Sequence, residues 1–235
     1  MTSDVEQDAH PGLLALLLLL PALTARAACH DTVVLVHGNT GSPADFQNTH
    51  NLLRQRGWSD AQISAPAWGK AFCAACNDHN GSEETPVRNA ISSAIASSCT
   101  GRIDVIGHSM GVTLAMREID KLNVSAKVDV FIGIAGAVHG QWSCGMYPFN
   151  VASSTCDSYG LSVHSPLLQG IAGHRFGVHM YSMKSWGDEI NCYASCIVDG
   201  VHTSTIQGED FSFDYPYGHY QLLWYTATDQ VNLLQ

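Results

Sequence analysis

Charged side chains are scarce in this 235-residue sequence: Asp, Glu, Lys and Arg make up 14% of it, against a usual share of about 25%. Basic residues are the scarcer kind, with 11 Lys and Arg against 21 Asp and Glu and a net charge of −10. Nucleic-acid binding depends on clusters of Lys and Arg that contact phosphates, and the sequence has no such cluster. We therefore expect no nucleic-acid partner and a surface built largely of uncharged residues.

Linkers, charge blocks, internal repeats and low-complexity tracts are also absent beyond residue 30. Apolar residues make up 46% of the sequence, which is enough to build a sizeable core and excludes intrinsic disorder. These properties predict a single folded domain over residues 28–235.

Long hydrophobic runs are missing as well, because the leucine-rich run at residues 13–20 is too short to span a bilayer, which requires about 20 apolar residues. A small-x-small cleavage pattern follows at residues 25–27, so residues 1–27 resemble a secretory signal peptide. The segment departs from the usual pattern because acidic residues, and no Lys or Arg, precede the run. We expect a secreted, extracellular protein.

Cysteine, in contrast, is plentiful: eight residues, an even number, favour disulfides in an oxidising compartment. The spacings of Cys73 with Cys76 and of Cys192 with Cys196 also occur in zinc sites, but no pair of histidines is spaced to complete such a site. We therefore expect no metal. Eight cysteines allow 105 pairings; pairing sequence neighbours joins 73 with 76, 144 with 156 and 192 with 196, and leaves 29 with 99.

Short β-branched runs alternate with helical patterns along the chain. The runs at 32–36, 103–106 and 128–134 are typical of strands buried on both faces of a parallel sheet. This alternation predicts an α/β fold, with a mostly parallel central sheet and helices on both faces. Further strands are predicted at 62–68, 178–185 and, less regularly, 202–207; helices are predicted from Ser42 to Gly57, from Thr85, through Val112–Ile119 and near 220–229. Residues 137–177 lack a pattern, and a disulfide between Cys144 and Cys156 would clamp them.

The most specific motif is Gly107-His108-Ser109-Met110-Gly111, a G-x-S-x-G sequence where a predicted buried strand meets a predicted amphipathic helix. In this context the motif forms a nucleophile elbow, a tight turn that exposes a serine Oγ above the sheet. The two glycines are needed because larger side chains would collide with the neighbouring strand and helix. The motif predicts Ser109 as a catalytic nucleophile at the positive end of a helix dipole.

A second motif, His37-Gly38-Asn39, directly follows the first buried strand. A nucleophile elbow needs two backbone N–H donors for the oxyanion. One comes from the residue after the nucleophile, Met110, and the other from an early strand–helix loop, where Asn39 is well placed. We expect His37 to shape this loop rather than to carry a proton, because it precedes the nucleophile in the sequence.

These motifs resemble those of the class 2 lipases, small enzymes of the α/β-hydrolase superfamily. Residues 33–38, residues 103–111 and the pair Gly218-His219 carry the resemblance, which extends over roughly residues 30–230. It implies an α/β-hydrolase fold and ester hydrolysis through an acyl-enzyme, with no cofactor. Secreted polyhydroxyalkanoate depolymerases share a similar elbow.

The other members of a Ser-His-Asp triad follow the nucleophile in this fold, the acid first and the histidine second. His219 lies in a Gly-His-aromatic turn just before the last helical pattern, and its place in the resemblance agrees with a role as the base. Asp188 lies just past the predicted strand at 178–185, where the fold requires the acid that orients the imidazole. Asp199 is the main competitor for this role, and Asp214 is a poorer one.

Four further titratable residues lie near these motifs. We expect His108 to point away from the nucleophile and Asp104, which recurs in the resemblance, to be structural. The side chain of Glu189 should aim away from the base. His139 is the remaining histidine expected to line the substrate pocket.

Together these features predict a triacylglycerol lipase or short-chain esterase that acts on a neutral ester or lipid and contacts the lipid–water interface transiently. No protein partner is implied. A polyhydroxyalkanoate or other polyester depolymerase is the alternative within the same chemistry. A catalytically silent α/β-hydrolase that only binds a ligand is disfavoured, because it should have lost Ser109, His219 or the elbow glycines.

Overall fold

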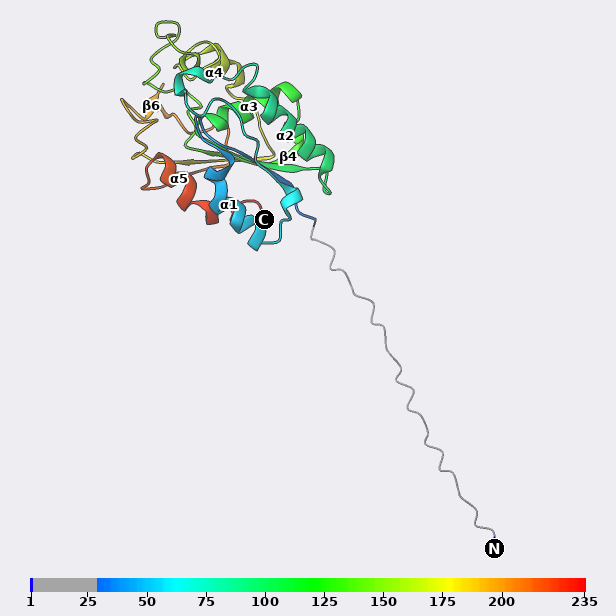
Figure 1. Cartoon of the computed structure of the whole chain (residues 1–235). Coiled ribbons are helices and arrows are strands. Elements are labelled where there is room, and N and C mark those ends of the chain that lie inside the picture. Colours follow the sequence, from blue (N-terminus) through cyan, green and yellow to red (C-terminus); the bar gives the residue numbers. More distant parts are fainter. Residues whose placement is uncertain (2–28) are drawn as a thin grey trace.

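The computed structural model describes Met1 and residues 29–235. Residues 2–27 of the predicted signal peptide lie outside this part. The described chain is built on a six-stranded sheet in which all neighbouring strands are parallel, in the order β2-β1-β3-β4-β5-β8 (Figure 1). The strands are β1 (Thr32–Val36), β2 (Ile63–Ser64), β3 (Ile103–His108), β4 (Val128–Ile134), β5 (His179–Lys184) and β8 (Phe211–Asp214); β6 (Ile197–Val198) and β7 (Val201–His202) form a separate antiparallel pair.

Helices cover both faces of the sheet (Figure 1). Apolar residues of α2, α3 and α4 pack on one face, and those of α1, α5 and α6 pack on the other. In β1, Val34 and Val36 belong to the first core and Val33 and Leu35 to the second, so the strand is buried on both faces as its sequence predicts. The helices are α1 (Gln47–Gln55), α2 (Glu84–Ser97), α3 (Met110–Leu122), α4 (Pro166–Ile171), α5 (His219–Tyr225) and α6 (Ala227–Asn232). Within residues 29–235, no helix has the length and apolar character that a membrane span requires.

The predicted elements are confirmed along most of the sheet and wrong at its margins. The run at 62–68 contributes only two residues to a strand, β2, before Pro66. The run at 202–207 does not join the main sheet; instead β7 pairs with β6, and the outer strand is β8. The last helical pattern is divided into α5 and α6 at Thr226, whose hydroxyl donates to the carbonyl of Leu222 at 2.6 Å. A hydrogen bond from a threonine hydroxyl to the carbonyl four residues earlier competes with the backbone hydrogen bonds of the helix.

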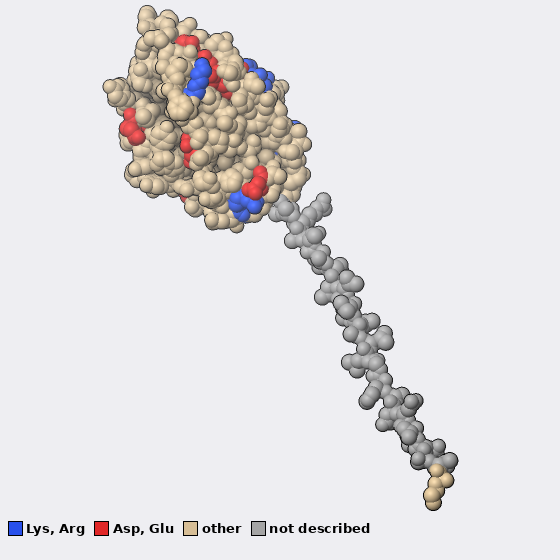
Figure 2. Space-filling view, viewed as in Figure 1, with Lys and Arg blue, Asp and Glu red and all other residues tan. Residues whose placement is uncertain are grey.

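Four disulfides are present, and they are the pairs expected from sequence neighbours: Cys29 with Cys99, Cys73 with Cys76, Cys144 with Cys156 and Cys192 with Cys196. The Cys144 pair clamps the irregular segment between β4 and β5, which also contains α4. Several disulfides are compatible with an extracellular protein. Charged side chains are sparse and scattered on the face shown in Figure 2.

Candidate active site

Ser109 occupies the turn between β3 and α3, as the G-x-S-x-G motif predicts. Its backbone has φ 54° and ψ −131°, a conformation that a non-glycine residue keeps only where the surrounding structure enforces it. Its N–H donates to the carbonyl of Ile134 in β4 at 2.8 Å, which ties the turn to the neighbouring strand. Ser109 is also the N-cap residue of α3, so the positive end of that helix lies beside it.

The glycines of the elbow allow this turn to pack closely. A Cβ at Gly107 would lie 2.7 Å from the Cα of Val112 in α3. A Cβ at Gly111 would lie 2.3 Å from the carbonyl oxygens of Val36 and His37 at the end of β1. The collisions expected from the sequence are therefore present on both sides of the turn.

The loop after β1 passes directly against the serine. A Cβ at Gly38 would lie 2.9 Å from the Cβ of Ser109. In the described part of the chain, no protein acceptor pairs with the backbone N–H of Asn39, the next residue, or with that of Met110, the first residue of α3. Two free N–H donors thus flank the serine, as stabilisation of an oxyanion would require.

A buried histidine–aspartate pair comes from the ends of β5 and β8. Nδ1 of His219, the first residue of α5, lies 2.9 Å from both Oδ1 and Oδ2 of Asp188. His219 is 3% exposed and Asp188 is fully buried. The ring of His219 lies 4.9 Å, between centroids, from that of His108, which precedes Ser109 in the chain. The structure therefore brings the three predicted triad residues to the same edge of the sheet, where β3, β5 and β8 end.

Asp188 is held ionised although it is buried. Burial alone would raise its pKa, but hydrogen bonds from His219 and from the backbone N–H groups of Asn191 and Ile190 outweigh that effect, and the pKa lies below its usual value. The two backbone donors lie 2.9 Å and 3.0 Å from Oδ1. An ionised carboxylate in this position favours the Nδ1–H tautomer of His219 and leaves Nε2 free to accept a proton.

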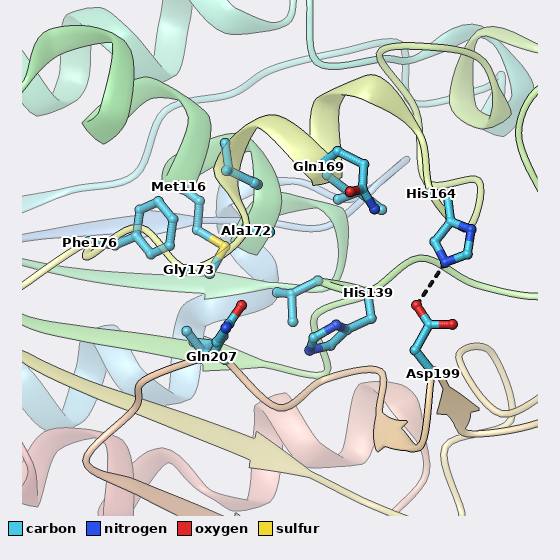
Figure 3. Close-up of a pocket in the computed structure, with 13 residues that line it drawn as sticks. Met116, His139, His164, Gln169, Ala172, Gly173, Phe176, Asp199 and Gln207 are labelled. Carbon is cyan, nitrogen blue, oxygen red and sulfur yellow. Dashed lines mark hydrogen bonds and ion pairs between the residues drawn. The ribbon is translucent and has the colours of Figure 1, made fainter.

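The competing acids are paired elsewhere. Asp199 accepts from Nε2 of His164 at 2.7 Å, and this pair is exposed (Figure 3). Asp214, at the end of β8, lies 3.6 Å from Nζ of Lys184. The structure pairs His219 with Asp188 and with neither competitor.

His139 lines a cavity that is also bordered by Met116 of α3. The cavity has a volume of about 200 Å³ and is bordered by the His164–Asp199 pair, with Met116 and Phe176 on its apolar side (Figure 3). Met116 lies seven residues beyond Ser109 on α3, which corresponds to about 10 Å along a helix axis. None of the three predicted triad residues lines this cavity, and the expectation that His139 lines the substrate pocket stays a prediction.

Two residues that follow Asp188 in the chain hold the histidine–aspartate pair in place, and only Asn191 of the two did not stand out in the sequence. Glu189 accepts a hydrogen bond from the backbone N–H of His219 at 2.9 Å. The side-chain amide of Asn191 donates to the carbonyl of Ala135 at 2.6 Å and to Oδ2 of Asp188 at 3.2 Å. The contact of Glu189 is with the backbone of His219, and it fixes the start of α5. Only the spacing of Asn191 three residues after Asp188 could have indicated its contact.

The histidines of the two motifs are buried and bond to the backbone. Nε2 of His108 donates to the carbonyl of His219 at 3.2 Å. Burial, together with the proximity of His219, lowers the pKa of His108 to about 3. Nε2 of His37 accepts from the backbone N–H of Trp68 at 3.2 Å, so Nδ1 carries the proton and donates to the carbonyl of Gly38 at 2.8 Å. Burial also lowers the pKa of His37. Both rings are neutral at ordinary pH, and both brace loops of the site.

Two groups of potential metal ligands occur within residues 29–235. In the first, Cys192 and Cys196 are joined in a disulfide beside His202. The second, Asp31, Asp104 and Asp129, lies where β1, β3 and β4 begin, at the edge of the sheet opposite Ser109. Burial, with repulsion from Asp31, raises the pKa of Asp104 to about 8. Asp104 also accepts from the backbone N–H of Val130 at 3.1 Å, which is a structural contact.

Comparison with known proteins places this geometry in a family. Residues 30–232 match the family model of the class 2 lipases. The fold is similar to that of the mature Bacillus licheniformis lipase BlEst2, with a TM-score of 0.57 at 12% identity over 88% of this chain and 93% of that one. It is also similar to one of the metagenome-derived lipolytic enzymes LipS and LipT (TM-score 0.59, 11% identity, 86% and 92% covered). The pyrethroid hydrolase PytH is a third similar structure (TM-score 0.53, 13% identity, 86% and 96% covered).

These similarities show an α/β-hydrolase fold, and the family match extends over almost all of the described chain. The family implies an ester or lipid substrate. The chain is a carboxylic ester hydrolase and belongs to the class 2 lipase family.

Proposed function

We propose that this protein is a secreted serine hydrolase that cleaves lipid esters through a Ser109–His219–Asp188 triad. Nε2 of His219 removes the proton from Ser109 Oγ, which attacks the ester carbonyl, and the protonated imidazole is stabilised by Asp188. The backbone N–H groups of Asn39 and Met110 stabilise the tetrahedral oxyanion. His219 then protonates the departing alcohol, and water attacks the acyl-enzyme by the same steps in reverse.

The observation that carries this proposal is the buried His219–Asp188 pair beside the strained serine turn. The pair places the only proton of a neutral imidazole on Nδ1, so the other nitrogen is available as a base. A catalytically silent relative would have no need to bury an ionised carboxylate behind a histidine, because burial of such a group is costly.

The substrate side of the proposal is supported by exposed aromatic residues on the loops that follow the strands. Phe72 follows β2, Phe149 follows β4, and Trp186 and Tyr193 follow β5. Their exposed fractions are 103%, 87%, 60% and 79% in that order. Loops that follow parallel strands lie at one edge of the sheet, the edge that holds Ser109. We infer that these side chains contact the lipid–water interface while the ester enters the site.

Export is the remaining part of the proposal. It is supported by the four disulfides and by the signal-peptide pattern in residues 1–27. N-terminal sequencing of the exported protein should find Ala28 as its first residue. An intact N-terminus on exported protein would contradict cleavage at this position.

The chemistry is tested by labelling with a fluorophosphonate, which modifies activated serines. The wild type and Ser92→Ala, a substitution on an exposed position of α2, should be labelled to the same extent. Ser109→Ala should be neither labelled nor active. Full esterase activity in Ser109→Ala would overturn the proposal.

The substrate class is tested with p-nitrophenyl esters of increasing chain length, emulsified triglyceride and polyhydroxybutyrate film. We expect hydrolysis of the p-nitrophenyl esters and of the emulsion. Hydrolysis of the film alone would instead favour the polyester depolymerase.

A further inference from the structure

Asn77 is a fully buried asparagine in the loop between β2 and α2, and no step of the proposed mechanism uses it. Its Oδ1 accepts from the backbone N–H of Lys70 at 2.7 Å, and its Nδ2 donates to the carbonyl of the same residue at 3.1 Å. Because a backbone N–H can only donate, the first contact fixes which end of the amide is oxygen. Nδ2 therefore has one further proton, which it donates to Oδ1 of Asn39 at 2.6 Å.

Asn39 is held at both ends of its own amide. While Oδ1 accepts from Asn77, Nδ2 donates to the carbonyl of Ala74 at 2.9 Å. Both partners belong to the loop of residues 70–77, which the disulfide between Cys73 and Cys76 closes. The side chain of Asn39 is thus fixed to this loop, while its backbone N–H remains unpaired within residues 29–235.

The loop of residues 70–77 is itself supported from a distant part of the chain. Oγ1 of Thr155 lies 2.6 Å from the carbonyl oxygen of Asn77 and within hydrogen-bonding distance of that of Ala74. Thr155 is 7% exposed and precedes Cys156, which is bonded to Cys144. A continuous set of hydrogen bonds therefore connects the segment after β4 to Asn39.

The loop that carries Asn39 is also held by a turn of its own, in which the N–H of Gly41 donates to the carbonyl of Gly38 at 3.1 Å. His37 is fixed by Trp68, which donates to its ring and to its carbonyl. After Asn39, Thr40 has φ 58°, a left-handed conformation that is unfavourable for a β-branched residue. Besides this turn, the contact with Trp68 on one side and the contact with Asn77 on the other fix the position of the Asn39 N–H.

We propose that Asn77 is a positioning residue for the oxyanion hole: through the side chain of Asn39 it holds the Asn39 backbone N–H where the tetrahedral intermediate needs it. This inference rests on the proposed function. An oxyanion donor stabilises the transition state only if it is preorganised, and loss of one donor costs about 100- to 1,000-fold in kcat. A displaced donor should cost less, about 10- to 100-fold in kcat, with KM changed by less than about 3-fold.

The test compares Asn77→Ala, Asn39→Ala and the double variant. Asn39→Ala keeps the backbone N–H and removes only the side chain that Asn77 holds. All three should lose similar factors in kcat, because residues that act through one contact are not additive. Each should also lose affinity for an alkyl boronic acid by the same factor as kcat/KM. This ligand becomes tetrahedral on a catalytic serine, so a variant that was merely less stable would keep its affinity.

Gln230→Ala is the matched control. Gln230 is also a fully buried amide, but it bonds to Thr49 and to α5 and α6 on the other face of the sheet. It should lower the melting temperature and leave kcat and boronate affinity within about 2-fold of the wild type.

Wild-type kcat and boronate affinity in folded Asn77→Ala would overturn the proposal. If Asn77→Ala does not fold, the half-exposed Asn39→Ala decides alone, with the same two outcomes. Ser109→Ala separates a failure of the proposed function from a failure of the role proposed for Asn77. An inactive Ser109→Ala with a fully active Asn77→Ala would reject the role of Asn77 and leave the proposed function standing.

Discussion

Among the histidine–aspartate pairs within residues 29–235, two that have similar distances lie in very different surroundings. In one, Nδ1 of His219 lies 2.9 Å from Asp188, and the exposed fractions are 3% and 0%. In the other, Nε2 of His164 lies 2.7 Å from Asp199, and the side chains are 37% and 64% exposed. The shorter hydrogen bond belongs to the exposed pair, so distance alone does not distinguish it from the pair that we propose to be catalytic.

The difference between the pairs lies in what else contacts the carboxylate. Asp188 accepts from three further donors of Ile190 and Asn191. Water solvates Asp199, and an exposed pair of this kind contributes about 0–1 kcal/mol because solvent screens it. Burial together with directed donors makes an imidazole a base of defined tautomer and orientation.

The largest difference in kcat between matched variants of the two pairs is expected for the histidines. His219→Ala should lower kcat by about 10⁵- to 10⁶-fold, because the nucleophile loses its base. His164→Ala should stay within about 2-fold of the wild type. Steady-state hydrolysis of a p-nitrophenyl ester measures both. A comparable loss in both variants would mean that the exposed pair takes part in the reaction.

A smaller contrast is expected for the aspartates. Asp188→Asn keeps the shape of the side chain but favours the wrong tautomer of His219, and kcat should fall by about 10⁴-fold. Asp199→Asn should have nearly wild-type kcat in the same assay. If Asp199→Asn were the more damaged variant, the assignment of the acid would be wrong.

Removal of a donor around Asp188 should lower kcat less than removal of the Asp188 carboxylate does. Asn191→Leu removes the side-chain contacts to Asp188 and to the carbonyl of Ala135 but keeps the backbone donor. We expect kcat to fall by about 10-fold and unfolding to become easier by about 1–3 kcal/mol, because the carbonyl of Ala135 loses its partner. Urea unfolding and steady-state kinetics check the two effects. An unchanged kcat would show that the backbone donors and His219 suffice to hold Asp188.

The smallest expected difference is in how the free energy of unfolding depends on pH. Because the pKa of Asp188 is lowered in the folded protein, its ionisation contributes stability that is present above its unfolded pKa of about 3.9 and is lost as the pH falls through the folded pKa. Between about pH 5 and about pH 3, the free energy of unfolding should therefore fall less steeply in Asp188→Asn than in the wild type. Parallel curves for the wild type and Asp188→Asn would contradict a lowered pKa of Asp188 in the folded protein.

The centre of the fold could be predicted from the sequence because its signals are local. Consecutive residues are enough to recognise the apolar runs of β1, β3 and β4 and the Gly107–Gly111 motif. The outer strand β8 could not be found in this way. It is four residues long and lies at the edge of the sheet, and although its residues alternate between apolar and polar, so short a run is at the lower limit at which alternation predicts a strand.

The same distinction applies to the site. Ser109, Asp188 and His219 follow strands at positions that the fold requires, so sequence order is enough to nominate them. The residues that support the site act through contacts between distant loops: Glu189 and Asn191 contact the histidine–aspartate pair, and Asn77 contacts Asn39. A polar residue in a loop has no periodic pattern, and its partner is known only when the chain has folded.

The central claim is that Ser109 forms an acyl-enzyme with the help of the buried pair, and rapid-quench mass spectrometry tests it most directly. The wild type is mixed with an excess of a p-nitrophenyl ester, stopped with acid during the first turnovers and digested. We expect the wild type to release a burst of p-nitrophenol and to carry the acyl group on the peptide that contains Ser109. Ser109→Ala should show no burst and no acylated peptide. An acyl group on another residue, or the same burst in Ser109→Ala, would contradict the central claim.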